Sequence, residues 1–190
     1  MRVIAGQYKR RRLEAPTWDG LRPTGDRVKE TLFNVVGPRV AGARVLDGFA
    51  GSGALGIEAL SRGAREVVFV ESDRRAVDLI ARNLAGIGIR SGYVMMPTDL
   101  LEALRGLPES QRFELALLDP PYAFADVEGV LEHVAAVMVR DGVIVLEHAR
   151  RRPVPAGTGA AVRTRAIVVG QSALAFYRTA PGGAGVGEVP

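Results

Sequence analysis

The chain has 190 residues, a length that forms one domain able to bury roughly 70% of its unfolded surface without cross-links. It contains no cysteine and only two histidines, which excludes disulfides, thiolate metal sites and cysteine nucleophiles and leaves a metal centre unexpected. The N-terminus lacks a signal-peptide pattern and no apolar run is long enough to cross a bilayer, so we expect a cytoplasmic protein without membrane contact. We also expect the protein to be a monomer.

The net charge of +4 is unevenly placed, because the first dozen residues hold five cations and no acid. These cations are Arg2, Lys9, Arg10, Arg11 and Arg12, and the apolar residues mixed with them predict a short exposed hairpin or arm over residues 2–13. A basic patch of this kind suits phosphate groups, so we expect residues 9–12 to bind nucleic acid. The alternative is a charged edge strand that resists aggregation.

A helix is predicted over residues 26–36, with Thr24 as its N-terminal cap and Gly37-Pro38 as its end. Arg22, Thr24 and Arg27 are candidates to line a binding cleft, where Arg22 would hold the nucleic acid or a cofactor carboxylate. The alternative is a capped, solvated helix start. With the basic arm, this helix makes residues 1–39 a predicted nucleic-acid-binding appendage.

From residue 40 onward, apolar strands alternate with helical stretches, which predicts a mostly parallel, doubly wound α/β sheet with helices on both faces. The predicted strands are residues 44–47, 67–71, 93–96, 115–119 and 143–147, and the predicted helices are residues 54–62, 76–84, 100–107 and 127–139. Residues 162–169 and 173–178 follow as an antiparallel hairpin at one edge. We therefore expect a Rossmann-like domain over residues 40–178 and a flexible tail over the Gly- and Pro-rich residues 179–190.

A glycine-rich loop joins the first strand of this sheet to its helix. Gly51, Gly53 and Gly56 match the spacing G-x-G-x-x-G, which lets a tight turn bring the backbone close to a ligand. Glu71 stands twenty residues after Gly51, where a carboxylate can accept both hydroxyls of a ribose. In this strand–loop–helix context, the loop favours a nucleoside-type cofactor over a plain turn with a surface acid.

Two nucleoside cofactors, NAD and S-adenosylmethionine (SAM), suit such a loop. SAM is favoured because about forty residues precede the loop and because Asp47 places negative charge where SAM carries an ammonium and a sulfonium. Asp99 is placed either to accept a hydrogen bond from the adenine amine or to cap the helix that follows it. The predicted cofactor-binding residues are Asp47, Phe49, Ala50, Gly51, Ser52, Gly53, Glu71, Asp99 and Asp119.

The fourth strand ends in the run Asp119-Pro120-Pro121-Tyr122. Each proline fixes φ near −65° and lacks an N–H, so the turn is stiff and its carbonyl groups stay available as acceptors. Such acceptors beside an aromatic ring suit a planar group that carries an NH2, and a plain turn leaving a strand is the alternative. Since the first and fourth strands are neighbours in a doubly wound sheet, this turn and the glycine loop are expected to share one cleft.

Residues 51–56, Glu71 and residues 119–122 look like the amino-group methyltransferases that use SAM. The run Leu21-Arg22-Pro23-Thr24-Gly25-Asp26-Arg27-Val28-Lys29-Glu30-Thr31-Leu32-Phe33-Asn34, with residues 2–6 and 47–53, resembles the bacterial 16S ribosomal RNA guanine-N2 methyltransferases. This resemblance extends from Arg2 to about Arg178. The chain departs from the family at Gly48, where a bulkier apolar residue is usual and the glycine would loosen the cofactor loop, and at Gly25, where a second threonine is common.

The resemblance implies SAM-dependent methylation of the exocyclic N2 amine of a guanine in 16S rRNA, at guanine 966 in the standard rRNA numbering. The implied partner is 16S rRNA, the small ribosomal subunit or an assembly intermediate, and no metal takes part. In the mechanism expected here, Asp119 and the Pro120 carbonyl each accept one N–H of the amine, Pro121 stiffens the turn and Tyr122 stacks on the base. The expected RNA-binding residues are Lys9, Arg10, Arg11, Arg12, Arg22, Thr24 and Arg27.

Other functions stay open at this point. The same turn would grip the N6 amine of a DNA adenine or the N5 amide of a protein glutamine, although no added target-recognition domain is visible and the basic arm disfavours glutamine. An NAD-dependent oxidoreductase would use the glycine loop and leave residues 119–122 as a mere turn. A noncatalytic module would bind RNA without turnover.

Overall fold

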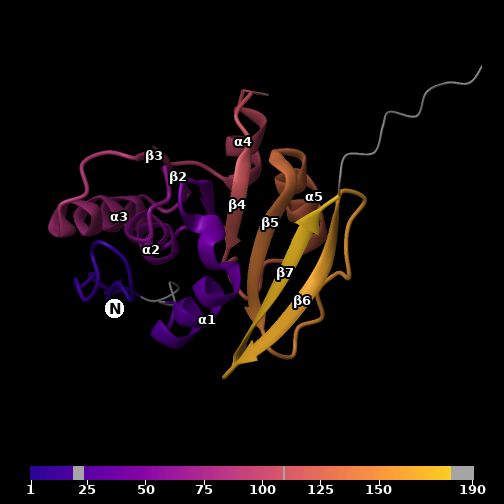
Figure 1. Ribbon diagram of the computed structural model, residues 1–190, viewed down its shortest axis with the longest axis horizontal. Helices are drawn as coiled ribbons and strands as arrows, with labels where there is room; N and C mark the ends of the chain where they lie inside the picture. The colour runs from indigo at the N-terminus through magenta and orange to yellow at the C-terminus, as the bar shows by residue number, and fades with distance from the viewer. Residues whose placement is uncertain (19–23, 109, 181–190) are drawn as a thin grey trace, which may run out of the picture.

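The computed structural model describes residues 1–18, 24–108 and 110–180, and these residues form a seven-stranded sheet in the order β3-β2-β1-β4-β5-β7-β6 (Figure 1). The strands are β1 (Arg44–Gly48), β2 (Glu66–Val70), β3 (Tyr93–Met96), β4 (Phe113–Leu118), β5 (Met138–Ala149), β6 (Ala161–Val169) and β7 (Ser172–Thr179). The first five run parallel, and β7 runs antiparallel to both β5 and β6. The predicted parallel sheet with a C-terminal antiparallel hairpin is confirmed.

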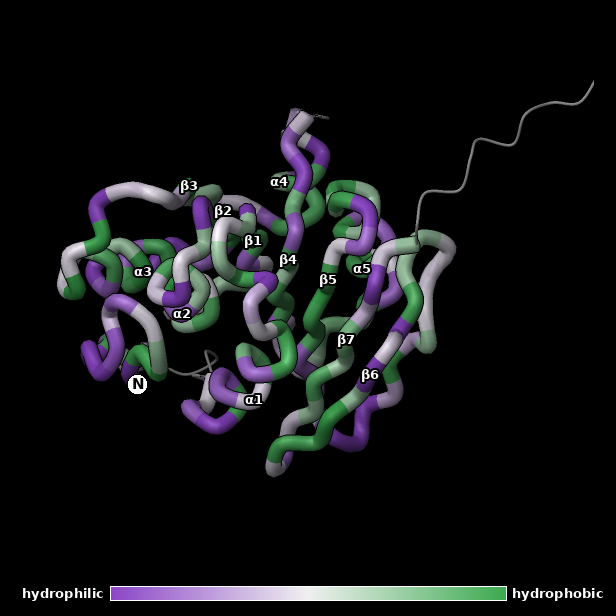
Figure 2. The backbone as a smooth tube through the Cα atoms, viewed as in Figure 1, coloured by the Kyte–Doolittle hydropathy of each residue, from purple (hydrophilic) through white to green (hydrophobic). Residues whose placement is uncertain are grey.

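Helices cover both faces of the sheet. One apolar cluster joins the sheet to α1 (Asp26–Val36), α2 (Ala54–Ser61) and α3 (Arg74–Ile87), and the other joins it to α4 (Leu100–Arg105) and α5 (Val127–Ala136). A short 3-10 helix, η1 (Gly37–Val40), precedes β1, which is buried at every position. Figure 2 shows the hydrophobic course of β5 through the middle of the molecule. The layers are those of a Rossmann-like α/β fold.

The start of α1 differs from the sequence prediction. The prediction that Thr24 caps this helix is wrong, because Gly25 is the cap residue and no side chain caps the first turn. The Thr24 hydroxyl instead donates to Oδ2 of Asp119 at 3.0 Å. A threonine hydroxyl can bond either its own backbone or a distant acceptor, and here a carboxylate at the end of β4 takes it.

The end of α5 also differs from the prediction, since the helix stops at Ala136 rather than at residue 139. Met138 already pairs with Phe113 of β4, so the chain turns into β5 five residues earlier than the expected start at residue 143.

None of the helices among the described residues combines the length and the hydrophobicity that a membrane span requires.

Residues 1–13 form a hairpin that docks onto α2 (Figure 1). Its cations are exposed, as predicted, but Val3 and Leu13 are almost fully buried in the core. The carboxylate of Glu58, which is itself fully buried in α2, accepts the backbone N–H groups of Ile4 at 2.7 Å and Ala5 at 3.0 Å. The segment is therefore an integrated part of the domain surface, which holds its basic tip in one place.

Candidate active site

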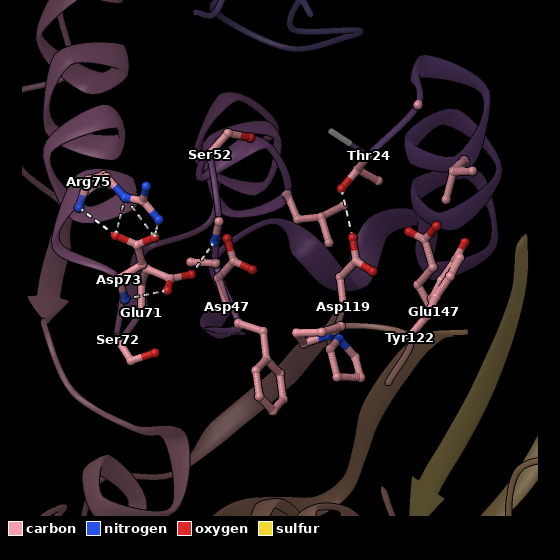
Figure 3. Close-up of a pocket in the computed structure, with 18 of the residues that line it drawn as sticks. Thr24, Asp47, Ser52, Glu71, Ser72, Asp73, Arg75, Asp119, Tyr122 and Glu147 are labelled. Atoms are coloured by element: carbon pink, nitrogen blue, oxygen red, sulfur yellow. Dashed lines mark hydrogen bonds and ion pairs between the residues drawn. The ribbon is translucent and has the colours of Figure 1, made fainter. Parts of the chain in front are cut away.

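A cavity of about 640 Å³ lies at the carboxyl ends of the parallel strands, where open α/β sheets bind their ligands (Figure 3). Its walls come from the loops after β1, β2 and β4, from Glu147 within β5, from Trp18 and from the start of α1. β1 pairs with both β2 and β4, so the glycine loop and the turn at residues 119–122 meet across it. The volume is within the range of small-molecule sites, which is roughly 300–1,000 Å³.

The glycine loop is held by two carboxylates. Oε2 of Glu71 accepts the N–H of Gly51 at 2.8 Å, and Oδ2 of Asp47 accepts the N–H of Gly56 at 2.8 Å. Gly56 also allows α2 to approach β2, because a Cβ there would lie 2.3 Å from the ring of Phe69. Glu71 retains accepting capacity for a ribose, since an ionised carboxylate has about four lone-pair sites and two serve the backbone.

Gly48 does not leave a void at the end of β1. A Cβ at this position would lie 2.8 Å from a methyl group of Leu118 and 3.1 Å from a methyl group of Leu100. These two leucines occupy the space of the missing side chain. The glycine is therefore accommodated by its neighbours beneath the loop.

Asp47 is buried in the floor of the cavity. Burial raises the pKa of its carboxyl well above the usual value, the hydrogen bond from the Gly56 N–H opposes that rise, and the nearby carboxylates of Asp119 and Glu71 add to it. A cationic ligand placed against Asp47 would favour its ionised form. The site thus favours positive charge at this point.

The turn after β4 is braced from several sides. The Thr24 hydroxyl holds the carboxylate of Asp119, and the hydroxyl of Tyr122 lies 3.2 Å from the hydroxyl of Ser172. The guanidinium of Arg152 donates to the carbonyl of Tyr122 at 2.8 Å and also to the carbonyl of Phe124. Tyr122 remains 40% exposed, so its ring can receive a flat ligand from outside. The turn is a fixed platform beside the cavity.

Sequence reasoning missed several residues that line the cavity. Glu147 closes it at the end of β5, and Trp18, Asp73 and Arg75 form the wall near Glu71. The guanidinium of Arg75 stacks 5.2 Å from the centre of the Trp18 ring and pairs with the carboxylate of Asp73 at 2.6 Å. An acid directly after an apolar strand was the available signal for Glu147, and it is the same signal that pointed to Asp47, Glu71 and Asp119.

Most of the predicted cofactor-binding residues line the cavity, namely Asp47, Phe49, Ala50, Gly51, Ser52, Glu71 and Asp119, together with Pro120, Pro121 and Tyr122 of the turn. Gly53 caps α2 in the left-handed conformation. Asp99 lies outside the lining, where it is exposed and caps α4 by accepting the N–H of Leu101. Its contact with adenine stays a prediction.

The predicted RNA-binding residues are distributed over two places. Thr24 lines the cavity, whereas Arg27 is exposed on α1. The basic tip of the hairpin comprises Lys9 and Arg10 in its turn and Arg11 and Arg12 in the arm that follows, and all four are exposed. Arg22 lies outside the described residues. Across the described part of the chain, no three Asp, Glu or His side chains are grouped in a way that would hold a metal ion.

A family model described as conserved hypothetical protein 95 matches residues 1–178. The chain is 38% identical over 181 residues to YlbH of Bacillus subtilis, provisionally named an rRNA methyltransferase, with 94% of this chain and 98% of that protein covered. It is 38% identical over 143 residues to ribosomal RNA small subunit methyltransferase D of Escherichia coli, with 75% and 68% covered. A solved Escherichia coli structure, yhhF, provisionally named a methyltransferase, superposes with a TM-score of 0.83 at 32% identity, with 96% and 99% covered.

Proposed function

Since the chain belongs to the family described as conserved hypothetical protein 95, a bacterial family of 16S rRNA methyltransferases, we propose that it methylates the exocyclic N2 amine of a guanine in 16S rRNA with SAM as the donor. The proposed position is guanine 966 in the standard rRNA numbering. The substrate is the free RNA, the small subunit or an assembly intermediate, and the enzyme acts as a cytoplasmic monomer. In this proposal residues 1–39 contact RNA and residues 40–178 bind SAM.

The observation that carries this proposal is the charge of the cavity. Five carboxylates line it, from Asp47, Glu71, Asp73, Asp119 and Glu147, and among the described residues of its lining Arg75 is the one cation, paired with Asp73. Such a wall suits the sulfonium and ammonium groups of SAM and opposes the pyrophosphate of a dinucleotide. The negative charge of the residues that line the cavity therefore favours SAM over NAD.

The glycine loop and Glu71 would hold the nucleoside of SAM, and Asp47 would face its ammonium group. SAM supplies an electrophilic methyl group when bound. Asp119 and the Pro120 carbonyl each accept one N–H of the guanine amine, which frees the nitrogen lone pair from the ring and aims it toward the donor. Tyr122 stacks on the base, and Thr24 keeps the carboxylate of Asp119 in its orientation.

Positioning carries most of this catalysis. Correct alignment of two reactants can contribute about 7–11 kcal/mol. A general base contributes about 10²–10⁴-fold, or roughly 3–5.5 kcal/mol. Asp119 therefore acts first as an orienting acceptor and at most as a late proton acceptor.

The target guanine must leave its stack to reach the cavity. The exposed cations at the hairpin tip are proposed to bind the phosphates that flank it, together with Arg27, which is exposed on α1. A role for Arg22 in the same contact stays a prediction from the sequence. Because the hairpin is anchored through Glu58, these cations keep a fixed relation to the cavity.

Asp119→Ala tests the proposal. The variant should lose methylation of 16S rRNA, while its affinity for SAM, measured by calorimetry, stays close to that of the parent protein. NAD should bind neither the variant nor the parent protein. Asp78→Ala removes an exposed carboxylate from α3, away from the cavity, and serves as the matched control with parental activity. An Asp119→Ala protein that methylates at nearly the parental rate would refute the role of this residue.

A further inference from the structure

Glu147 on β5 stands beside Asp119, the residue that directly follows β4. Leu118 pairs with Leu146 in parallel register, so the residues that follow them stand side by side, with neighbouring strands about 4.7–4.9 Å apart. Glu147 is only 6% exposed and lines the cavity. Figure 3 shows its side chain rising beside those of Asp119 and Tyr122. Glu147 has no role in holding the amine or SAM in the proposed reaction.

Two adjacent carboxylates match two adjacent donors on one base. The edge of guanine carries the N2 amine next to an N1–H, whereas the amine of adenine or cytosine is flanked by a ring nitrogen that bears a lone pair. An ionised carboxylate only accepts hydrogen bonds. A flipped base is read along this edge, so two carboxylates placed side by side can distinguish guanine from the other amine-bearing bases.

We propose that Glu147 accepts the N1–H of the target guanine while Asp119 holds its N2 amine, which makes Glu147 the residue that selects guanine. This inference rests on the proposed function and deepens it. The neighbouring strands fix the spacing of the two carboxylates, and the braced turn carries Tyr122 against the face of the same base.

The burial of Glu147 makes this contact selective. In open solvent, water would replace a missing partner at little cost. In an enclosed site built to hydrogen-bond a substrate N–H, an analogue without that hydrogen is rejected by roughly 10⁴–10⁵-fold. A base with a lone pair at N1 would in addition place that lone pair against the negative carboxylate.

The test uses an RNA in which 2-aminopurine replaces the target guanine. This base keeps the 2-amino group that accepts the methyl but has a lone pair at N1. The ratio of kcat/KM for the guanine and 2-aminopurine RNAs is measured for the parent protein, for Glu147→Gln and for the control Glu132→Gln, which alters an exposed residue of α5. 2-Aminopurine also lacks O6, and comparing the ratios between proteins removes that shared effect.

In the parent protein and in Glu132→Gln, kcat/KM for the guanine RNA should exceed that for the 2-aminopurine RNA by at least about a hundredfold. This value allows for a site that rejects 2-aminopurine less strongly than a fully enclosed site would. Glu147→Gln should lower this preference by about tenfold or more, because the amide can donate to N1 of 2-aminopurine. Equal ratios in Glu147→Gln and the parent would overturn the inference. A parent protein that methylates both RNAs equally well would also overturn it, and this second measurement does not depend on the folding of any variant. Failure of the parent to methylate the guanine RNA would instead contradict the proposed function.

Discussion

Gly6 lies where the backbone of the N-terminal hairpin packs against the backbone of α2 at Ser61. Its φ is +83°, and a Cβ added there would lie 1.8 Å from the backbone oxygen of Ser61. Because that oxygen cannot rotate away, Gly6→Ala must displace the hairpin from Glu58 and from the pocket that buries Val3. Gly6→Ala thus adds one methyl group where the backbone of the hairpin contacts the backbone of α2.

The magnitude follows from two contributions. A residue with a Cβ loses about 1–2 kcal/mol in the left-handed region. Forced displacement of a packed segment adds about 1–3 kcal/mol. Gly42 isolates the first contribution, because its φ is +74° and a Cβ there would meet nothing within 4 Å. Gly6→Ala should therefore lower the free energy of unfolding by about 1–3 kcal/mol more than Gly42→Ala does.

Urea unfolding of the two variants measures this difference, and RNA binding measures its consequence. If the hairpin positions the basic tip, Gly6→Ala should weaken the affinity for 16S rRNA and leave the affinity for SAM unchanged, while Gly42→Ala changes neither. Equal losses of stability in the two variants, or parental RNA affinity in Gly6→Ala, would refute the docking of residues 1–13 as described.

The remaining predictions concern the cavity and the basic tip. Burial raises the pKa of Asp47, so its contribution to stability is present below the ordinary carboxyl pKa and is lost as pH rises through the raised value. Asp47→Asn should therefore become more stable than the parent protein as pH rises, and its SAM affinity should be about 10- to 150-fold lower. Parental SAM affinity in this variant would contradict the prediction. Thr24→Val should reduce kcat by about 10- to 100-fold at parental SAM affinity, whereas Thr31→Val, which removes an exposed hydroxyl on α1, should not. Alanine at Lys9, Arg10, Arg11 and Arg12 should lower the salt dependence of RNA binding by about 0.7 per lost phosphate contact, and an unchanged slope would show that these cations do not bind phosphate.

The layered fold was predictable because its signals are local and regular. The strands β1 to β4 have four to six residues each and alternate with helices. This alternation is typical of a doubly wound parallel sheet, in which the first and fourth strands are neighbours. The same arrangement predicts that the glycine loop lies beside Asp119, since both follow neighbouring parallel strands. Motifs at strand ends converge in this fold whatever their separation along the chain.

Contacts between distant segments were not predictable in the same way. Val3 and Leu13 are single apolar residues among cations. Their burial depends on Glu58, which is distant in the sequence and accepts the backbone N–H of Ile4 in the hairpin. The Thr24 hydroxyl had a local use as a cap and a distant use at Asp119, and sequence spacing does not choose between them. Glu147 was overlooked because an acid after a strand is as common on the surface as in a site.

Incubation with labelled SAM tests the central claim most directly, with 16S rRNA and small subunits from a strain that lacks this activity as substrates. Digestion and mass spectrometry then identify the modified nucleoside and its position. The account predicts a single N2-methylguanosine in 16S rRNA, formed by the parent protein and lost in Asp119→Ala. Label on adenine, label in protein, or RNA binding without any transfer would contradict it.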